Sequence, residues 1–340
     1  MHPFMILIFL AIFSEQVLTP TPEINSQNIA NFAPVAQIDF ATDPLQSGWF
    51  ALSDDGHLAT VAMPDSMLVE FSITGEQRVL YQQKDFVTGT YRGDTFIGLH
   101  APVDGYLLID NAMPVSEFLY EYDADTPAYP QDLFVTDETL FVEHQPMGMD
   151  NEAFVSLNAR DGDSISFIEY APSEDESAVV RIGRIPAPYA VTSSQTGDVT
   201  LWNWTTGAAL KTVNNGLDEP SVFGNINTSA SHLVWRDNAS ETLYLLDFET
   251  GENKTIAALN GDYVQWFFLS NDANVIIGVN IGFVPNVVAW DVATGEFLEL
   301  GNYLPCERPQ PDMARLSADG TTLVIGCDVG LQFWRIGAGK

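Results

Sequence analysis

Hydrophobic residues along most of this chain fall in short runs, separated by turns rich in Asp, Gly, Ser and Thr. Near the C-terminus, Met313–Leu316 precedes the turn Ser317–Gly320, and Leu323–Ile325 follows it. Alternating or fully apolar runs of this length, bounded by turn residues, predict β-strands rather than helices. Asp-Gly suits a hairpin turn because Gly adopts positive φ freely. An all-β fold is therefore expected.

The pattern of runs and turns repeats at a fixed spacing. Leu245–Glu252 and Ala289–Glu296 read almost alike, each with an apolar-Asp pair followed by Thr-Gly, and they lie 44 residues apart. Trp202-Asn203 and Thr206-Gly207 stand one step of 44 residues earlier. A period of about 40 to 45 residues, with several short strands in each repeat, is typical of the blades of a β-propeller.

Counting the positions equivalent to Trp290 gives the number of blades. The seven positions are Phe71, Ile109, Leu157, Trp202, Leu246, Trp290 and Trp334. We therefore predict a single domain over residues 32–340, a seven-bladed β-propeller of four-stranded blades. The seventh blade lacks its outer strand, because little chain remains after Trp334. Residues 34–40 are predicted to supply that strand, which would close the ring and remove an exposed edge.

The turns and strand ends also carry recurring short motifs. Ser53–Gly56 and Ser317–Gly320 are Ser-x-Asp-Gly turns, Trp290-Asp291 closes a third strand, and Thr294-Gly295 follows it. In these features the chain resembles the WD-repeat family, whose blades carry a Ser-Pro-Asp-Gly turn, a Trp-Asp pair and often a Thr-Gly turn. Only Trp290-Asp291 keeps the full pair. The resemblance implies protein partners on the face built from the longer loops.

The N-terminus predicts export. Residues 3–13 form an apolar run that is too short to span a bilayer but suits the core of a signal peptide. We assign residues 1–18 to a signal peptide or weak membrane anchor and residues 19–31 to a polar, Pro-containing linker. The protein is expected outside the cytoplasm, secreted or associated with the cell envelope. It would touch a membrane only through an uncleaved N-terminal segment.

The excess of acidic residues limits the classes of partner that we expect. The chain has 46 Asp and Glu against 13 Lys and Arg, for a net charge of −33. Such a surface repels phosphate backbones and anionic lipids, so nucleic acid is not an expected partner. The acidic residues are dispersed, which favours a role in solubility; recruitment of a cationic ligand is the alternative.

The ends of the second strands are predicted to form a polar ring at the mouth of the central channel. His100 and His144 end neighbouring second strands, and Asp237 and Asn280 hold equivalent positions. These four residues are the binding-site candidates. Two His and a carboxylate can bind a metal, but the spacing fixes no third ligand, so we predict neither metal nor cofactor. Elbow, phosphate-loop and His-Glu-x-x-His motifs are absent from the sequence, and no catalytic residue is assigned.

Two further features stand out. Phe283, Val284 and Pro285 make an apolar turn in the sixth blade, which is a candidate partner contact.

Cys306 and Cys327 are the two cysteines of the chain and are expected to reach the same face. In an exported protein a disulfide between them would close a loop of about 20 residues and stabilise the fold by roughly 3 kcal/mol. A buried free Cys327 is the alternative for a cytosolic protein.

Together these patterns predict an exported, non-catalytic propeller that serves as a monomeric protein-binding or scaffolding domain. One alternative is a propeller enzyme of the lactonase or glycosidase type, with its site at the channel mouth. Another is an envelope-assembly propeller attached to a membrane complex.

Overall fold

A computed structural model describes most of the chain from residue 21 to residue 336. The described ranges are 21–40, 50–63, 67–82, 86–100, 106–110, 113–118, 128–135, 139–146, 154–159, 164–169, 179–181, 189–193, 197–203, 206, 208–214, 222–227, 229–237, 240–259, 264–282, 285–304, 309–327 and 330–336. Side chains in several strands between residues 106 and 193 are not described.

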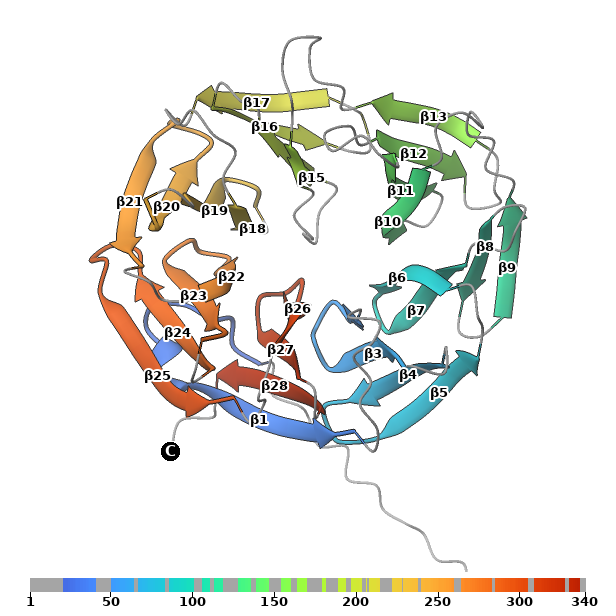
Figure 1. Cartoon of the computed structure of the whole chain (residues 1–340), viewed down its shortest axis with the longest axis horizontal. Helices are drawn as coiled ribbons and strands as arrows, with labels where there is room; N and C mark the ends of the chain where they lie inside the picture. Colours follow the sequence, from blue (N-terminus) through green and yellow to red (C-terminus); the bar gives the residue numbers. More distant parts are fainter. Residues whose placement is uncertain are drawn as a thin grey trace, which may run out of the picture.

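The described residues form seven four-stranded antiparallel sheets and one short 3-10 helix, η1 (Ile29–Asn31). Figure 1 shows the sheets arranged in a ring, in which β6, β10, β18, β22 and β26 lie nearest the centre. Six sheets consist of consecutive strands. They are β2 (Phe50–Leu52), β3 (Leu58–Ala62), β4 (Met67–Ser72) and β5 (Gln77–Gln82); β6 (Phe86–Arg92), β7 (Thr95–His100), β8 (Tyr106–Asp110) and β9 (Met113–Phe118); β10 (Ala128–Val135), β11 (Thr139–Pro146), β12 (Phe154–Ala159) and β13 (Ser164–Glu169); β14 (Val179–Arg181), β15 (Tyr189–Ser193), β16 (Asp198–Asn203) and β17 (Ala208–Asn214); β18 (Val222–Ile226), β19 (His232–Asp237), β20 (Thr242–Asp247) and β21 (Asn253–Ala258); and β22 (Val264–Leu269), β23 (Val275–Asn280), β24 (Asn286–Asp291) and β25 (Phe297–Tyr303).

The remaining sheet joins the two ends of the chain. Its strands are ordered β1 (Phe32–Asp39), β28 (Gly330–Ile336), β27 (Thr322–Cys327) and β26 (Pro309–Leu316). β1 is antiparallel to β28, in a register that runs from Phe32 opposite Ile336 to Asp39 opposite Gly330, with an irregularity at Pro34/Ala36. The residues expected to pair in this sheet, 34–40, therefore overlap the observed strand almost completely.

The repeated turns explain why these sequences recur. In three sheets a Ser hydroxyl accepts the backbone N–H five residues later, at 2.9 to 3.0 Å, and donates to the Asp two residues later. The three Ser are Ser53, Ser270 and Ser317. The side chain thus holds the tight turn that leads from the innermost strand to the second strand.

The Asp-x-x-Thr-Gly turns after β20 and β24 are built alike. Asp291 accepts from both the backbone N–H and the hydroxyl of Thr294, each at 2.8 Å. These bonds stabilise the carboxylate and hold the pKa of Asp291 below its ordinary value. At Asp247, burial acts to raise the pKa, but hydrogen bonds from Thr250 outweigh it and lower the pKa. Gly251 and Gly295 sit at φ +76° and +70°, which explains the Gly in both turns.

Replacing Thr294 by Val keeps the backbone N–H but removes the hydroxyl, so the pKa of Asp291 should rise toward its ordinary value. Because the folded pKa lies below the unfolded one, the turn's contribution to stability is present above pH ~4 and is lost as pH falls through the folded pKa. Carboxyl-carbon NMR titration measures the shift. As a control, Thr250→Val should move the pKa of Asp247 and leave that of Asp291 unchanged. An unchanged Asp291 pKa in Thr294→Val would contradict the assignment.

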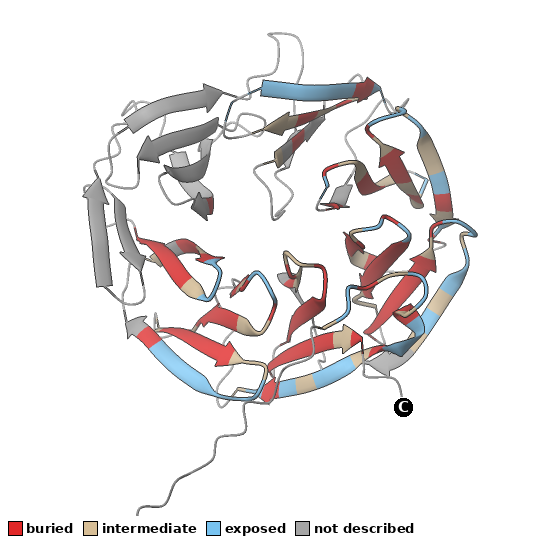
Figure 2. Cartoon of the chain, turned by 180° about the vertical axis from the view of Figure 1, so that it is seen from behind, coloured by how far each residue is buried: buried red, intermediate tan, exposed pale blue. Residues whose placement is uncertain are grey.

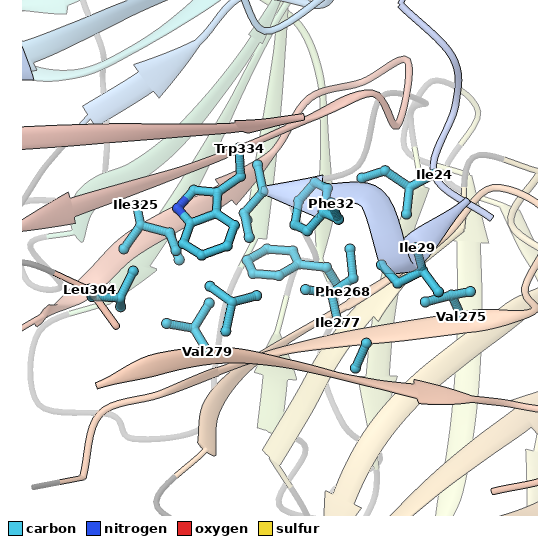
Figure 3. Packing of buried hydrophobic residues seen from close by; sticks show 14 of the residues in the cluster. Ile24, Ile29, Phe32, Phe268, Val275, Ile277, Val279, Leu304, Ile325 and Trp334 are labelled. Carbon is cyan, nitrogen blue, oxygen red and sulfur yellow. The ribbon is translucent and has the colours of Figure 1, made fainter. Parts of the chain in front are cut away.

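The core lies between neighbouring sheets of the ring. Figure 2 shows buried positions concentrated on inner strands and exposed positions on outer ones. One cluster joins the sheet of β22–β25 to the sheet of β26–β28, and Figure 3 shows Trp334, Phe268 and Phe32 within it. Ile24 and Ile29 are also buried there, at 1% and 2% exposure, although sequence analysis assigned them to a linker. In the described part of the chain, no helix is long and apolar enough to cross a membrane.

Candidate functional site

His100 and His144 were both predicted to lie at the ends of second strands; this is confirmed for His100, whereas β11 continues two residues beyond His144. His100 ends β7 opposite Phe86, the first residue of β6. Its side chain is fully buried, and its ring meets the Phe86 ring edge-on, with the centroids 5.4 Å apart. His100 therefore packs in the interior rather than facing an open channel mouth. His144 lies in β11, opposite Pro130 on one side and Phe154 on the other.

Asp237 and Asn280 lie at the ends of β19 and β23 and close the turns that follow. An Asp237 carboxylate oxygen accepts the Ser240 N–H at 3.0 Å, and the Asn280 side-chain oxygen accepts the Gly282 N–H at 2.8 Å. In the sixth sheet, Pro285 is buried and its carbonyl accepts the Leu304 N–H at 2.8 Å. Phe283 and Val284 lie outside the described residues.

Cys327 ends β27 with 1% of its surface exposed, and it is not a free thiol. Cys306 lies outside the described residues, so its pairing with Cys327 stays a prediction.

A series of hydrogen bonds links the inner turns of successive sheets on one face of the ring. Asn227 Nδ2 donates to the Asn271 carbonyl at 3.2 Å, and Asn271 Nδ2 donates to the Asp319 carbonyl at 3.1 Å. The Asp319 N–H donates to the Asp54 carbonyl, and the Gly93 N–H donates to the Asp54 carboxylate, each at 3.0 Å. We call these five residues the turn belt. It ties together the sheets that begin with β18, β22, β26, β2 and β6.

Four aspartates, Asp54, Asp55, Asp94 and Asp319, form an acidic group at one point of the turn belt. Burial raises the pKa of Asp54; the Gly93 N–H lowers it, whereas the neighbouring charges of Asp55, Asp319 and Asp94 raise it further, and the net shift is upward. Arg335 from β28 lies beside this group and donates to the Asp55 carbonyl at 3.0 Å. Partial burial lowers the pKa of Arg335, whereas the charges of Asp55 and Asp319 act to raise it.

Within this acidic group, and among the described residues, Asp55, His57 and Asp94 bring metal-binding atom types together. One donor atom from each lies within 4.8 Å of the others. His57 Nδ1 is 2.5 Å from an Asp55 oxygen, and its Nε2 is 3.9 Å from Asp94. Carboxylates and imidazole are ligands that divalent cations accept. The sequence carried one usable signal, an Asp and a His on either side of Gly56, but Asp94 comes from the next sheet.

A second polar group, also missed from sequence, is buried between the first two sheets. The Tyr91 hydroxyl of β6 lies 2.6 Å from the Thr60 hydroxyl and donates to Glu70 at 3.0 Å. The other Glu70 oxygen is 2.8 Å from Arg78 on the outer strand β5. Burial raises the pKa of Tyr91 well above its ordinary value, so the phenol stays protonated and can donate.

Tyr91→Phe should reduce the free energy of unfolding by about 1–3 kcal/mol, because it leaves buried polar atoms of Glu70 and Thr60 without the phenol. Urea denaturation measures this loss. In a double-mutant cycle with Thr60→Val, the combined variant should lose less than the sum of the single losses, because Thr60 and Tyr91 contact each other. Strict additivity would show that the 2.6 Å contact contributes nothing.

Comparison with known proteins supports the architecture. No protein-family model and no curated protein matches the chain. Among solved structures 1509 chains match. One, from a crystal structure of a mitotic checkpoint complex, superposes with a TM-score of 0.60 and covers 98% of this chain and 99% of that chain. The chain has a β-propeller fold. At the 13% identity of this match, the likeness concerns the fold and not a ligand or an activity.

Proposed function

We propose that this chain is a seven-bladed propeller of the WD-repeat type, closed into a ring by β1, that serves as a protein-binding module. The observation that carries the proposal is the match over 98% of the chain to a propeller from a multiprotein complex. The seven sheets of the described residues and the pairing of β1 with β28 support the blade count and the closure.

The partner is proposed to meet the face that carries the loops between second and third strands and between blades. Asp237 and Asn280 end second strands on this side, and Pro285 directly precedes the third strand β24. With a net charge of −33, the chain favours a partner with a cationic contact surface. The apolar run at the N-terminus supports export, with the partner outside the cytoplasm.

Affinity capture with the full chain tests this proposal. Phe283→Ser alters the apolar turn that the sequence singles out as a candidate partner contact, whereas Glu249→Gln changes an exposed turn residue after β20. We expect a saturable partner that is lost with Phe283→Ser, kept with Glu249→Gln, and bound more weakly as the salt concentration rises. A partner captured equally by both variants would place the interface elsewhere. Turnover in a hydrolase screen, without any saturable partner, would favour the enzyme alternative.

A further inference from the structure

The outer strand of one sheet comes from the opposite end of the chain, and the segment before it is docked as well. The Ile24 N–H donates to the Gly320 carbonyl at 3.3 Å. Ile24, Ile29 and Phe32 then fill the space between two sheets, beside Trp334 and Phe268 (Figure 3). This part of the chain therefore acts as three apolar anchors followed by a strand.

The same segment is anchored at its other end. Ile38 is 8% exposed and packs in a cluster with Val61 and Phe333, which bridges the sheet of β26–β28 and the sheet of β2–β5. The Phe40 ring lies against that of Phe71, with the centroids 5.2 Å apart. We call residues 24–40 the closing segment. It contacts three sheets, and all of its backbone pairing within a sheet is with β28.

The connection that follows the closing segment is long. β1 ends at Asp39 and β2 begins at Phe50, so ten residues, 40–49, separate them, whereas three residues, 83–85, separate β5 from β6. Ten extended residues reach about 33–36 Å, which is about the diameter of a small domain.

We propose that the edge of β28 forms a docking site for a strand-forming segment, together with the two seams, which are the interfaces of this sheet with the sheets of β22–β25 and β2–β5. In this proposal, a second copy of this chain supplies that segment. Six of the seven residues of β28 are buried while the closing segment is in place, and without that segment β28 would be an unpaired edge. The sequence that fits this edge and both seams is the closing segment itself. Exchange between two copies retains each of its contacts, so its cost is low and protein concentration decides the outcome.

Variants of the full chain that each add one cysteine to the native Cys306 and Cys327 test the exchange. Gln37 and Gln332 face each other in the register of β1 and β28. Gln37→Cys and Gln332→Cys, carrying different tags, are mixed at high concentration, incubated and oxidised. We expect a covalent heterodimer on a non-reducing gel, with a yield that rises with concentration. The matched control replaces Gln332→Cys by Thr212→Cys, on the exposed strand β17, and should give no heterodimer.

Two further variants separate the proposal from a failure of the cross-link. Gln37→Cys/Gln332→Cys in one chain should form an intramolecular disulfide at low concentration, which shows that the two positions meet. Ile24→Ala/Ile29→Ala should speed exchange severalfold, because it removes two anchors. An intramolecular disulfide in the double variant, with no heterodimer at any concentration, would overturn the proposal, as would equal yields with the Thr212→Cys control. The proposal rests on the β1–β28 pairing, so the outcome of partner capture does not affect it.

Discussion

Trp334→Ala is expected to lower the free energy of unfolding by about 3–5 kcal/mol, because it removes a large side chain from the buried core and leaves a cavity. The Trp334 side chain is fully buried, and its ring lies 5.8 Å from that of Phe32. Its ring N–H also donates to Gln332 at 3.1 Å. The cavity would open where the closing segment meets the sheets, so the loss should include weaker docking of that segment.

Urea denaturation followed by circular dichroism measures this loss. Phe297→Ala is the matched control, because that aromatic ring on β25 is 48% exposed. Its loss should stay below about 1 kcal/mol. Similar losses for the two variants would mean that the cluster around Trp334 contributes no more to stability than an exposed ring does.

Gly330→Ala is expected to cost about 3 kcal/mol, by steric conflict rather than by a cavity. A Cβ at this position would lie in direct overlap with the Ile38 carbonyl oxygen and 2.9 Å from its carbon. Both are backbone atoms, so no side-chain rotation relieves the conflict. The end of β1 would have to move away from β28, and the ladder would shorten there.

Hydrogen exchange of residues 36–39 reports the change directly, since their amides should lose protection. Gly93→Ala is the control: it has φ +58°, and nothing lies within 4 Å of the added Cβ. Its cost should be about 1 kcal/mol, from backbone strain alone. If Gly330→Ala lowered the free energy of unfolding no more than Gly93→Ala does, the steric explanation would be wrong.

Sequence patterns predicted the local structure well, because strands and turns depend on nearby residues. Each of the seven positions equivalent to Trp290 lies in the third strand of its sheet. The Ser-x-Asp and Asp-x-x-Thr-Gly turns form through bonds between residues two to five apart, such as Ser317 to Thr322 and Asp291 to Thr294. The pairing of β1 with β28 was predicted from the number of strands in each repeat, because the seventh repeat lacked a fourth strand.

Contacts between sheets were beyond the reach of sequence patterns. Tyr91 meets Glu70 and Thr60 across a seam, and none of the three belongs to the repeated residues. His100 was expected to be accessible because it ends a strand, yet it is fully buried beside Phe86. Ile24 and Ile29 flank the polar run Asn25–Asn28, so the periodicity of a buried element was not visible there.

The pairing of β1 with β28 also sets an order of events during synthesis. Phe32 pairs with Ile336, so 304 residues (336 − 32) separate the partners. At about 5–20 residues per second, the ribosome needs roughly 15–60 s to make that stretch. The six sheets made of consecutive strands can form as they emerge. β1 therefore leaves the ribosome long before its partner β28, and during that interval Ile24, Ile29 and Phe32 are exposed to chaperones and to neighbouring chains.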